Sequence, residues 1–156
     1  MRRKGGYQKK TLPSDYKFTR VDITRFINYL MSNGDKATAE RVFYGAMAEI
    51  EKATKEDPVD IFNKAIQNAS PLVQVVSKRV GGANYQVPRE VRPERKFFLA
   101  SHWIIDAAKK RKGVPMAKKL SEELVAASKN EGAAIKKKQD THRMAEANRA
   151  FASFVR

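Results

Sequence analysis

A Gly-Gly pair at positions 81 and 82 lies between two runs that alternate like β-strands, in the stretch KRVGGANYQVPRE (78–90). Nothing else in the chain alternates in this way. Glycine readily adopts the positive φ angles that a two-residue hairpin turn requires. The sequence therefore predicts a two-stranded β-ribbon at about 72–91. The residue pairs expected from this turn are Val80 with Ala83, Lys78 with Tyr85, and Val76 with Val87.

The same register accounts for the proline in the second strand. Pro88 falls opposite Val75 in a non-hydrogen-bonded pair, where the missing N–H group costs no ladder bond. A lone two-stranded ribbon is marginal in water, so we expect it to pack on the body or to be ordered by a partner. Two interpretations stay open here: a surface hairpin with solvated charges, or a basic finger for RNA in which Tyr85 stacks on bases.

Three helices are predicted before the ribbon, from apolar residues that recur at helical spacing. The first starts at Asp22 and is ended by Gly34. Asp35 is placed to cap the second helix. The third begins at Asp57-Pro58, a cap followed by proline at the first helical position, and Ser70-Pro71 stops it.

Three more helices are predicted after the ribbon. Arg92-Pro93 opens the fourth, Pro115 precedes the fifth, and the sixth runs from Ala133 into the Ala150-Phe151 region. The sixth helix is so polar that we expect it to leave the body and lie on a partner. The predicted fold is mainly α: a bundle of about six helices (19–156) with one protruding two-stranded β-ribbon, preceded by a flexible basic N-terminal arm (1–18).

The charge of the chain points to a polyanionic partner. Its 156 residues carry 32 basic and 17 acidic side chains, a formal net charge of +15. Residues 1–20 hold seven cations and one acid, and residues 72–156 hold nineteen cations and eight acids, whereas 21–71 are slightly acidic. The run Lys109 to Lys112 supplies four consecutive cations, more than the dipole at a helix C-terminus needs, which favours contact with phosphates.

Several kinds of chemistry lack support in the sequence. There is no cysteine, and the two histidines, His102 and His142, fall on different predicted helices, so we expect no metal and no cofactor. No phosphate-binding glycine loop and no nucleophile motif occur, so we expect no enzyme. No apolar run is long enough to span a membrane and no signal-peptide core precedes the body, so we expect a soluble, cytoplasmic protein.

Two long motifs resemble a known family. The stretch from Gly81 to Pro93, GGANYQVPREVRP, and the stretch from Asp140 to Phe151, DTHRMAEANRAF, closely resemble the bacterial small-subunit ribosomal protein seven, or uS-seven, family. The length and the order of elements also match, so that the resemblance covers nearly the whole chain.

The resemblance implies a helical body with a protruding β-ribbon and no catalytic role. It implies a structural constituent of the small ribosomal subunit, a primary rRNA-binding protein that organises assembly of the head on the 3′ domain of the rRNA. It further implies that the ribbon points toward the exit-site tRNA and the mRNA path, and that neighbouring ribosomal proteins of the head and platform are partners.

The candidate binding residues combine these implications with the clustering of charge. The candidates for rRNA contact are Arg2, Arg3, Lys4, Lys9, Lys10, Lys17, Lys36, Lys78, Arg92, Arg95, Lys96, Lys109, Lys110, Arg111, Lys112, Lys136, Lys137 and Arg143. The candidates near tRNA and mRNA are Arg79, Gly81, Gly82, Asn84 and Tyr85.

The alternative interpretation is a free regulatory or architectural nucleic-acid-binding protein. DNA-binding modules usually present one helix with base-reading side chains. Here the cations are spread over an arm, a ribbon and several helix ends, a distribution that suits a folded RNA with phosphates on several sides. Co-sedimentation with small subunits distinguishes the two interpretations.

The charge predicts a steep salt dependence of RNA affinity. If roughly six to ten phosphates are neutralised, the affinity should fall by about 10³–10⁵ between 50 and 200 mM salt on the scale for duplex DNA, and somewhat less for RNA. Filter binding to small-subunit rRNA over that salt range measures the slope. A flat response would mean that the cationic surface does not carry binding.

Overall fold

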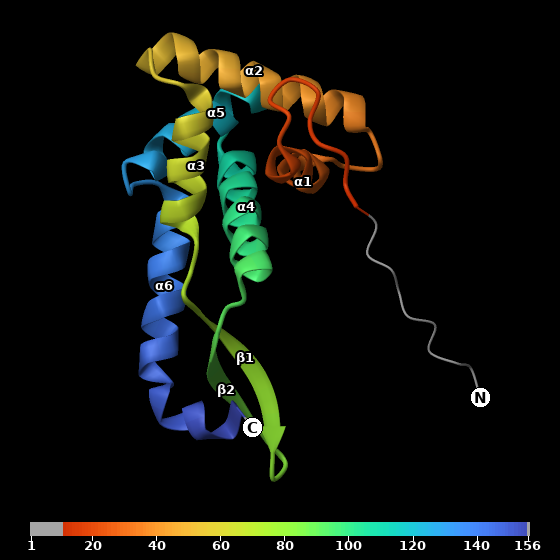
Figure 1. The fold of residues 1–156 in the computed structure, drawn as a ribbon. Coiled ribbons are helices and arrows are strands. Elements are labelled where there is room, and N and C mark those ends of the chain that lie inside the picture. The colour runs from red at the N-terminus through yellow and green to blue at the C-terminus, as the bar shows by residue number, and fades with distance from the viewer. Residues whose placement is uncertain (1–10, 156) are drawn as a thin grey trace, which may run out of the picture.

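Six α-helices, one β-hairpin and a C-terminal 3₁₀ segment follow one another in a computed structural model, which describes residues 11–155 (Figure 1). The elements are α1 Val21–Leu30, α2 Lys36–Thr54, α3 Pro58–Ala69, β1 Val73–Val80, β2 Ala83–Glu90, α4 Pro93–Lys110, α5 Met116–Ser128, α6 Ala133–Ala147 and η1 Arg149–Val155. The predicted mainly helical bundle with one β-ribbon is confirmed. Residues 1–10, most of the expected arm, lie outside the described part of the chain.

The predicted helix boundaries are set by the expected local signals. The Asp35 side chain accepts a hydrogen bond from the Thr38 amide at 3.1 Å, and Asp57 accepts one from the Val59 amide at 2.8 Å. Pro58 and Pro93 occupy the first positions of α3 and α4, where a proline needs no hydrogen-bond donor. One boundary differs slightly, because α1 ends at Leu30, before the glycine that was expected to end it.

The core is centred on three phenylalanine rings, one each from α1, α2 and α3. The centroids of Phe26 and Phe62 are 5.2 Å apart, and those of Phe43 and Phe62 are 5.8 Å apart, both in edge-on geometry. Helix α5 packs against α2, α3 and α4, and its Leu120 and Leu124 are completely buried. Burial of these apolar faces is what holds the bundle together.

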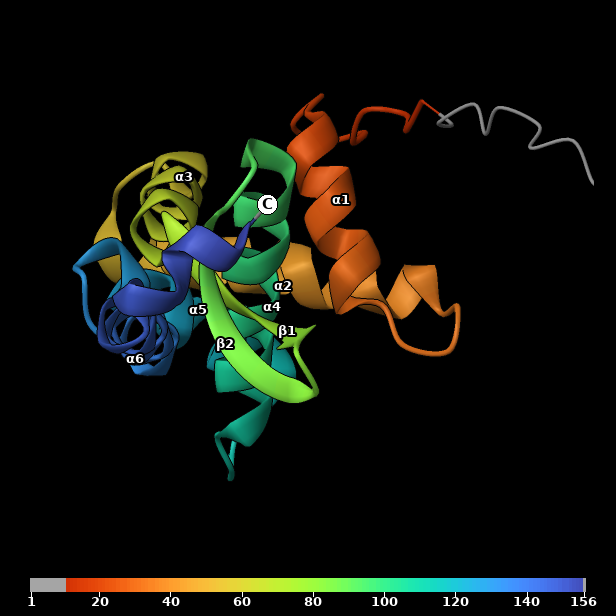
Figure 2. The ribbon, with the colours of Figure 1, turned by 90° about the horizontal axis from the view of Figure 1, so that it is seen from below.

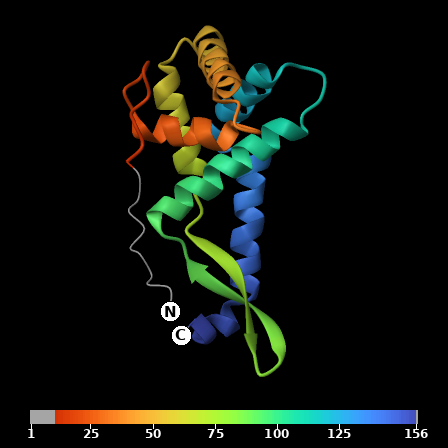
Figure 3. The same ribbon diagram turned by 90° about the vertical axis from the view of Figure 1, so that its right-hand side faces the viewer.

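The prediction that the polar sixth helix leaves the body is wrong, because α6 packs on the bundle. It packs against α3, α4 and α5 with its first turns and against the ribbon with its later ones. Figures 1 and 3 show it descending beside the ribbon. Its inner face is narrow and built from small or aliphatic residues, with Ala134, Ile135 and Ala145 buried. A helix that is polar on average can therefore still bury one side. The helix also ends at Ala147, earlier than expected, and the chain continues as η1.

The β-ribbon has the predicted register. Val80 pairs with Ala83, Lys78 with Tyr85, Val76 with Val87, and Val75 with Pro88. Gly81 and Gly82 have φ angles of 56° and 89°, as a two-residue turn of this type requires. Figure 2, seen from below, shows that η1 crosses close to β2, which agrees with the contacts between these two elements.

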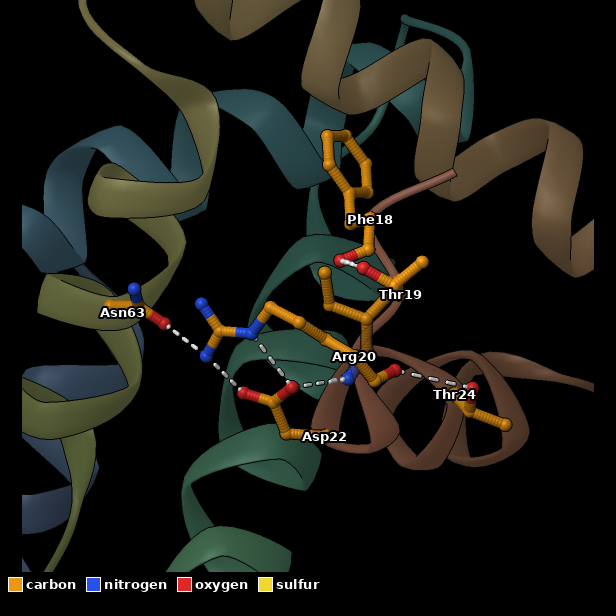
Figure 4. A network of polar contacts seen from close by, with 7 residues as sticks. Phe18, Thr19, Arg20, Asp22, Thr24 and Asn63 are labelled. Carbon is orange, nitrogen blue, oxygen red and sulfur yellow. Dashed lines mark hydrogen bonds and ion pairs between the residues drawn. The ribbon is translucent and has the colours of Figure 1, made fainter. Parts of the chain in front are cut away.

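The segment before α1 is tied to the body by polar contacts. Asp15 is buried and accepts hydrogen bonds from the Tyr44 hydroxyl and from the Phe18 amide, so the last residues of the expected arm lie against α2. The Arg20 guanidinium bonds both to Asp22 and to the Asn63 amide oxygen, at 2.8 Å, which links the start of α1 to α3 (Figure 4). The hydrogen bond to Asp22 raises the pKa of Arg20.

The packing predicts that two leucine-to-alanine substitutions differ sharply in their effect on stability. Leu120→Ala should lower the free energy of unfolding by about 2–5 kcal/mol, because it leaves a cavity in the fully buried centre of the bundle. Leu72→Ala is the matched control: Leu72 is 63% exposed, and its loss should change stability by less than about 0.5 kcal/mol. Urea unfolding followed by circular dichroism measures both, and equal effects would contradict the packing described here.

Candidate nucleic-acid interface

The ribbon is braced by the C-terminal segment of the chain. The Tyr85 ring of β2 lies 5.2 Å from the Phe151 ring and 5.4 Å from the Phe154 ring, centroid to centroid. The Lys78 ammonium on β1 donates a hydrogen bond to the Phe154 carbonyl oxygen at 2.7 Å. The sequence analysis predicted Tyr85 as a possible base-stacking group and Lys78 as an rRNA contact. In the structure both also hold η1 against the ribbon.

The root of the ribbon is fixed by backbone and histidine contacts. The Val91 amide donates to the Leu72 carbonyl at 3.0 Å, which continues the pairing of the strands beyond the ribbon. The Leu72 amide donates to Nε2 of His142 on α6 at 3.1 Å. One turn earlier on α6, the Lys138 ammonium donates to the Asn68 carbonyl at 2.6 Å. The contacts of Lys138 and His142 were missed by the sequence analysis, because only tertiary packing brings α6 to the ends of α3 and β1.

The tip of the ribbon projects with exposed residues. Arg79, Gly81, Gly82, Ala83 and Asn84 are all exposed, and the tip is the end of the ribbon farthest from the bundle in Figures 1 and 3. The aromatic brace ends at Tyr85, before the turn. The tip can therefore contact a ligand away from the bundle, through the cation Arg79 and through the exposed backbone of two glycines.

Cations at the start of α4 are held by the fold. Arg92 is the residue before the first turn of α4, and its carbonyl accepts the amides of Arg95 and Lys96, both at 2.9 Å. The Arg95 guanidinium lies over the Phe98 ring, 4.5 Å from its centroid, a cation–π contact that restricts its direction. Phe98 in turn packs against the His102 ring in a tilted arrangement, with ring centroids 4.0 Å apart. The arginine is thus supported by aromatic rings on the same helix.

Two of the predicted phosphate ligands nearer the N-terminus also have partners. The Lys17 ammonium lies 5.6 Å from the centroid of the Tyr44 ring, and burial is the main reason that the pKa of Tyr44 is raised. The Lys36 ammonium lies 3.6 Å from a carboxylate oxygen of Glu40, one turn along α2. Such an exposed ion pair is weak and leaves the lysine available to a stronger anion.

The basic run after α4 divides into exposed lysines and one engaged arginine. Lys109, Lys110 and Lys112 are exposed. The Arg111 guanidinium instead contacts Glu122 at 2.9 Å and Glu123 at 2.8 Å, and the hydrogen bond to Glu123 raises its pKa. Glu123 is completely buried and also accepts the Ala134 amide at 3.1 Å. Arg111 therefore compensates a buried carboxylate within the protein, a role that the spacing of the charges did not reveal.

Other predicted residues are brought together by the packing of α4 on α6. Lys110, Lys136 and Lys137 line one surface hollow with a volume of about 290 Å³, together with Trp103. Arg143 is exposed farther along α6, toward the ribbon. The arm cations Arg2, Arg3, Lys4, Lys9 and Lys10 lie outside the described residues. Within residues 11–155, the cations thus occupy separate surfaces on the bundle and along the ribbon.

The described residues form neither a metal-binding cluster nor a membrane-spanning helix. Among residues 11–155, no group of three or more histidine, aspartate or glutamate side chains is arranged so that it could hold a metal ion. In the same part of the chain, no helix combines the length and the apolar character needed to cross a membrane.

Comparisons with known proteins agree with the geometry. Residues 1–149 match the profile of a family described as ribosomal protein S7p/S5e. The chain is 52% identical to the small ribosomal subunit protein uS7 of Elusimicrobium minutum over 147 residues, which cover 94% of this chain and 92% of the relative. It is 50% identical to the protein of the same description from Neisseria meningitidis over 154 residues, and 48% identical to that from Bartonella tribocorum, with 99% of each chain covered in both cases.

The histidine at the ribbon root predicts a pH dependence. Burial, assisted by the charge of Lys138, lowers the pKa of His142 below its ordinary value of 6.5. Only the neutral ring can accept the hydrogen bond from the Leu72 amide at Nε2. Because the unfolded chain binds this proton more readily, the contribution to stability is complete above about pH 6.5 and is lost as the pH falls toward the lowered pKa.

This dependence can be measured at the residue itself. Titration by NMR should give His142 a pKa below 6.5, and amide exchange at Leu72, corrected for the intrinsic effect of pH, should quicken as the ring becomes protonated. His142→Gln is the control, because its amide oxygen can accept the same bond without titrating, and the pH effect should disappear. A pKa of 6.5 or higher would show that the ring is not held as described.

Proposed function

The chain belongs to the ribosomal protein S7p/S5e family, and from this premise we propose that it is a primary rRNA-binding protein that organises the head of the small subunit on the 3′ domain of the rRNA. It is a component of the small ribosomal subunit that acts in translation and is not an enzyme. Its partners include rRNA and other ribosomal proteins. We further propose that the ribbon tip lies near the exit-site tRNA and the mRNA path.

The observation that carries this proposal is the contrast between two cationic regions. At the start of α4, Arg95 is held over Phe98, and Phe97 packs against the core just beside it. Cations positioned in this way lose little side-chain entropy on binding, so they suit a permanent anchor on rRNA. The tip around Gly81 and Gly82 has no such support and can reach a ligand away from the bundle.

The remaining predicted contacts extend the anchor. The exposed lysines Lys109, Lys110 and Lys112 follow the other end of α4, and Lys136 and Lys137 lie on the neighbouring α6. A folded RNA can place phosphates on several sides of one protein, whereas a DNA duplex presents one groove to one element. This distribution supports an rRNA-bound structural protein over a free nucleic-acid-binding regulator.

The division between anchor and tip predicts opposite phenotypes for two variants. Arg92→Ala combined with Arg95→Ala should weaken binding to the isolated 3′ domain of the rRNA by roughly 1–3 kcal/mol in total, on the scale of hydrogen bonds to charged groups. A shortened ribbon should bind the same RNA almost normally and instead reduce tRNA retention or mRNA positioning at the exit side of assembled subunits. Filter binding and tRNA occupancy measure the two effects.

The shortened ribbon can be designed to keep its register. Deleting the pairs Arg79–Asn84 and Val80–Ala83 leaves Gly81-Gly82 to join Lys78 to Tyr85. Removing two pairs preserves the alternation of hydrogen-bonded and non-hydrogen-bonded positions. Lys52→Ala with Lys64→Ala is the charge-matched control for the arginine variant, since it removes two cations from α2 and α3. If the shortened ribbon abolished rRNA binding while the arginine variant bound normally, the two roles would be reversed.

A further inference from the structure

The hollow between α4 and α6 has a composition that the packing of the bundle does not require. Trp103, Asp106 and Lys110 line it from α4, and Lys136, Lys137 and Asp140 line it from α6. On α4 these residues are spaced three and four apart, and on α6 each lysine lies three or four residues before Asp140, so that each set borders the same side of its helix. The hollow encloses about 290 Å³. It thus brings one large aromatic ring together with three ammonium groups and two carboxylates.

The charged groups of this hollow are unpaired within the part of the chain that the structure describes. Across residues 11–155, the side chains of Asp106, Lys110, Lys136, Lys137 and Asp140 make no ion pair and no hydrogen bond, although opposite charges are close in sequence. Other charged side chains in the same helices behave differently, since Lys138 donates to a backbone carbonyl and Arg111, just after α4, contacts two carboxylates. The hollow therefore keeps its hydrogen-bonding capacity for a ligand.

We propose that this hollow binds one unpaired nucleotide of an RNA chain, with its phosphates on the lysines and its base against Trp103. The inference rests on the proposed function and adds a specific site to it. Trp103 is partly buried and packs against the core, which fixes the plane of its ring, while it also lines the hollow. An unstacked base lying on a positioned aromatic ring is a common mode of single-strand recognition.

The two carboxylates select among possible occupants. Asp106 and Asp140 can only accept hydrogen bonds when they are ionised, so they favour a ligand that offers donors beside its phosphate. An acidic peptide offers carboxylates, which the lysines would attract and the aspartates would repel. A nucleotide offers all three features: an anionic phosphate, a flat face, and donors on the edge of the base. Guanine fits best, because its N1–H and its amino group are adjacent donors that match one carboxylate, whereas uracil has a single N3–H between two carbonyl oxygens.

Trp103 is the only tryptophan of the chain, so its fluorescence reports on this site alone. The full-length protein is titrated with the pentaribonucleotides UUGUU and UUUUU. We expect saturable quenching by both, with the affinity for UUGUU greater by at least about fivefold. Equal affinities, or binding without any change in fluorescence, would overturn the proposal, and this comparison requires no variant to fold.

Three variants assign the roles. Lys136→Glu with Lys137→Glu should lower the affinity for both oligonucleotides by about tenfold or more, because attraction to the phosphates is replaced by repulsion. Asp106→Asn with Asp140→Asn should remove the preference for UUGUU to within about twofold, because an amide no longer matches two donors. The matched control, Lys118→Glu with Lys119→Glu, makes the same charge change on α5, away from the hollow. If this control weakened binding as much as the α6 variant does, the loss would come from the net charge of the protein and the proposed site would be wrong.

Filter binding of the wild-type protein to the 3′ domain of the rRNA separates this inference from the proposed function. If the rRNA domain binds and no oligonucleotide affects Trp103, the nucleotide site is wrong and the rRNA-binding function stands. If the rRNA domain does not bind, both fail. Circular dichroism of each variant verifies that it is folded before its affinity is compared.

Discussion

The β-ribbon depends on contacts supplied by the last part of the chain. Two strands alone bury too little surface to be stable in water. In this protein, Phe151 and Phe154 pack on Tyr85, while α6 lies along the root and binds it through His142. These contacts order the ribbon up to the turn without enclosing the turn itself. The direction of the ribbon is therefore set by α6 and η1, which must be in place before the tip can be aimed at any ligand.

The orientation of α6 depends in turn on close packing in the bundle. Ala100, Ala108, Ala127 and Ala134 are completely buried, and a small side chain at such positions lets neighbouring helices approach closely. Glu123 adds a polar tie at the same place, because it binds Arg111 after α4 and the Ala134 amide at the start of α6. Removing one partner of a buried charge pair is costly, so this contact favours a single arrangement of the loops around α5. Rigid packing at one end of α6 thus carries through the helix to the ribbon at the other.

The parts of this arrangement that local chemistry determines were predictable from the sequence. The Gly-Gly turn, the proline opposite Val75 and the aspartate caps each specify a local geometry that tertiary contacts did not override. The packing of α6 was not predictable, because its buried face consists of two alanines, one isoleucine and one threonine, which give only a weak apolar pattern. The contact between Tyr85 and η1 was missed for a related reason: the two lie more than sixty residues apart, and no periodicity connects them. Long-range partners of this kind require a structure.

The same distinction decides how much of the net charge of +15 is available to RNA. A sequence counts every cation equally, but the fold engages some of them. Arg20 and Arg111 are held by carboxylates, and Lys138 by a backbone carbonyl, so each is used in holding the protein together. Lys109 and Lys112 remain exposed and make no ion pair within residues 11–155. Because counterion release counts only phosphates that are newly neutralised, cations already held within the fold should add less to the salt dependence of binding than exposed ones. A cationic surface is therefore best described by which of its charges are already compensated within the fold, and residues 11–155 carry uncompensated cations at the end of α4 and on α6, where contact with RNA is proposed.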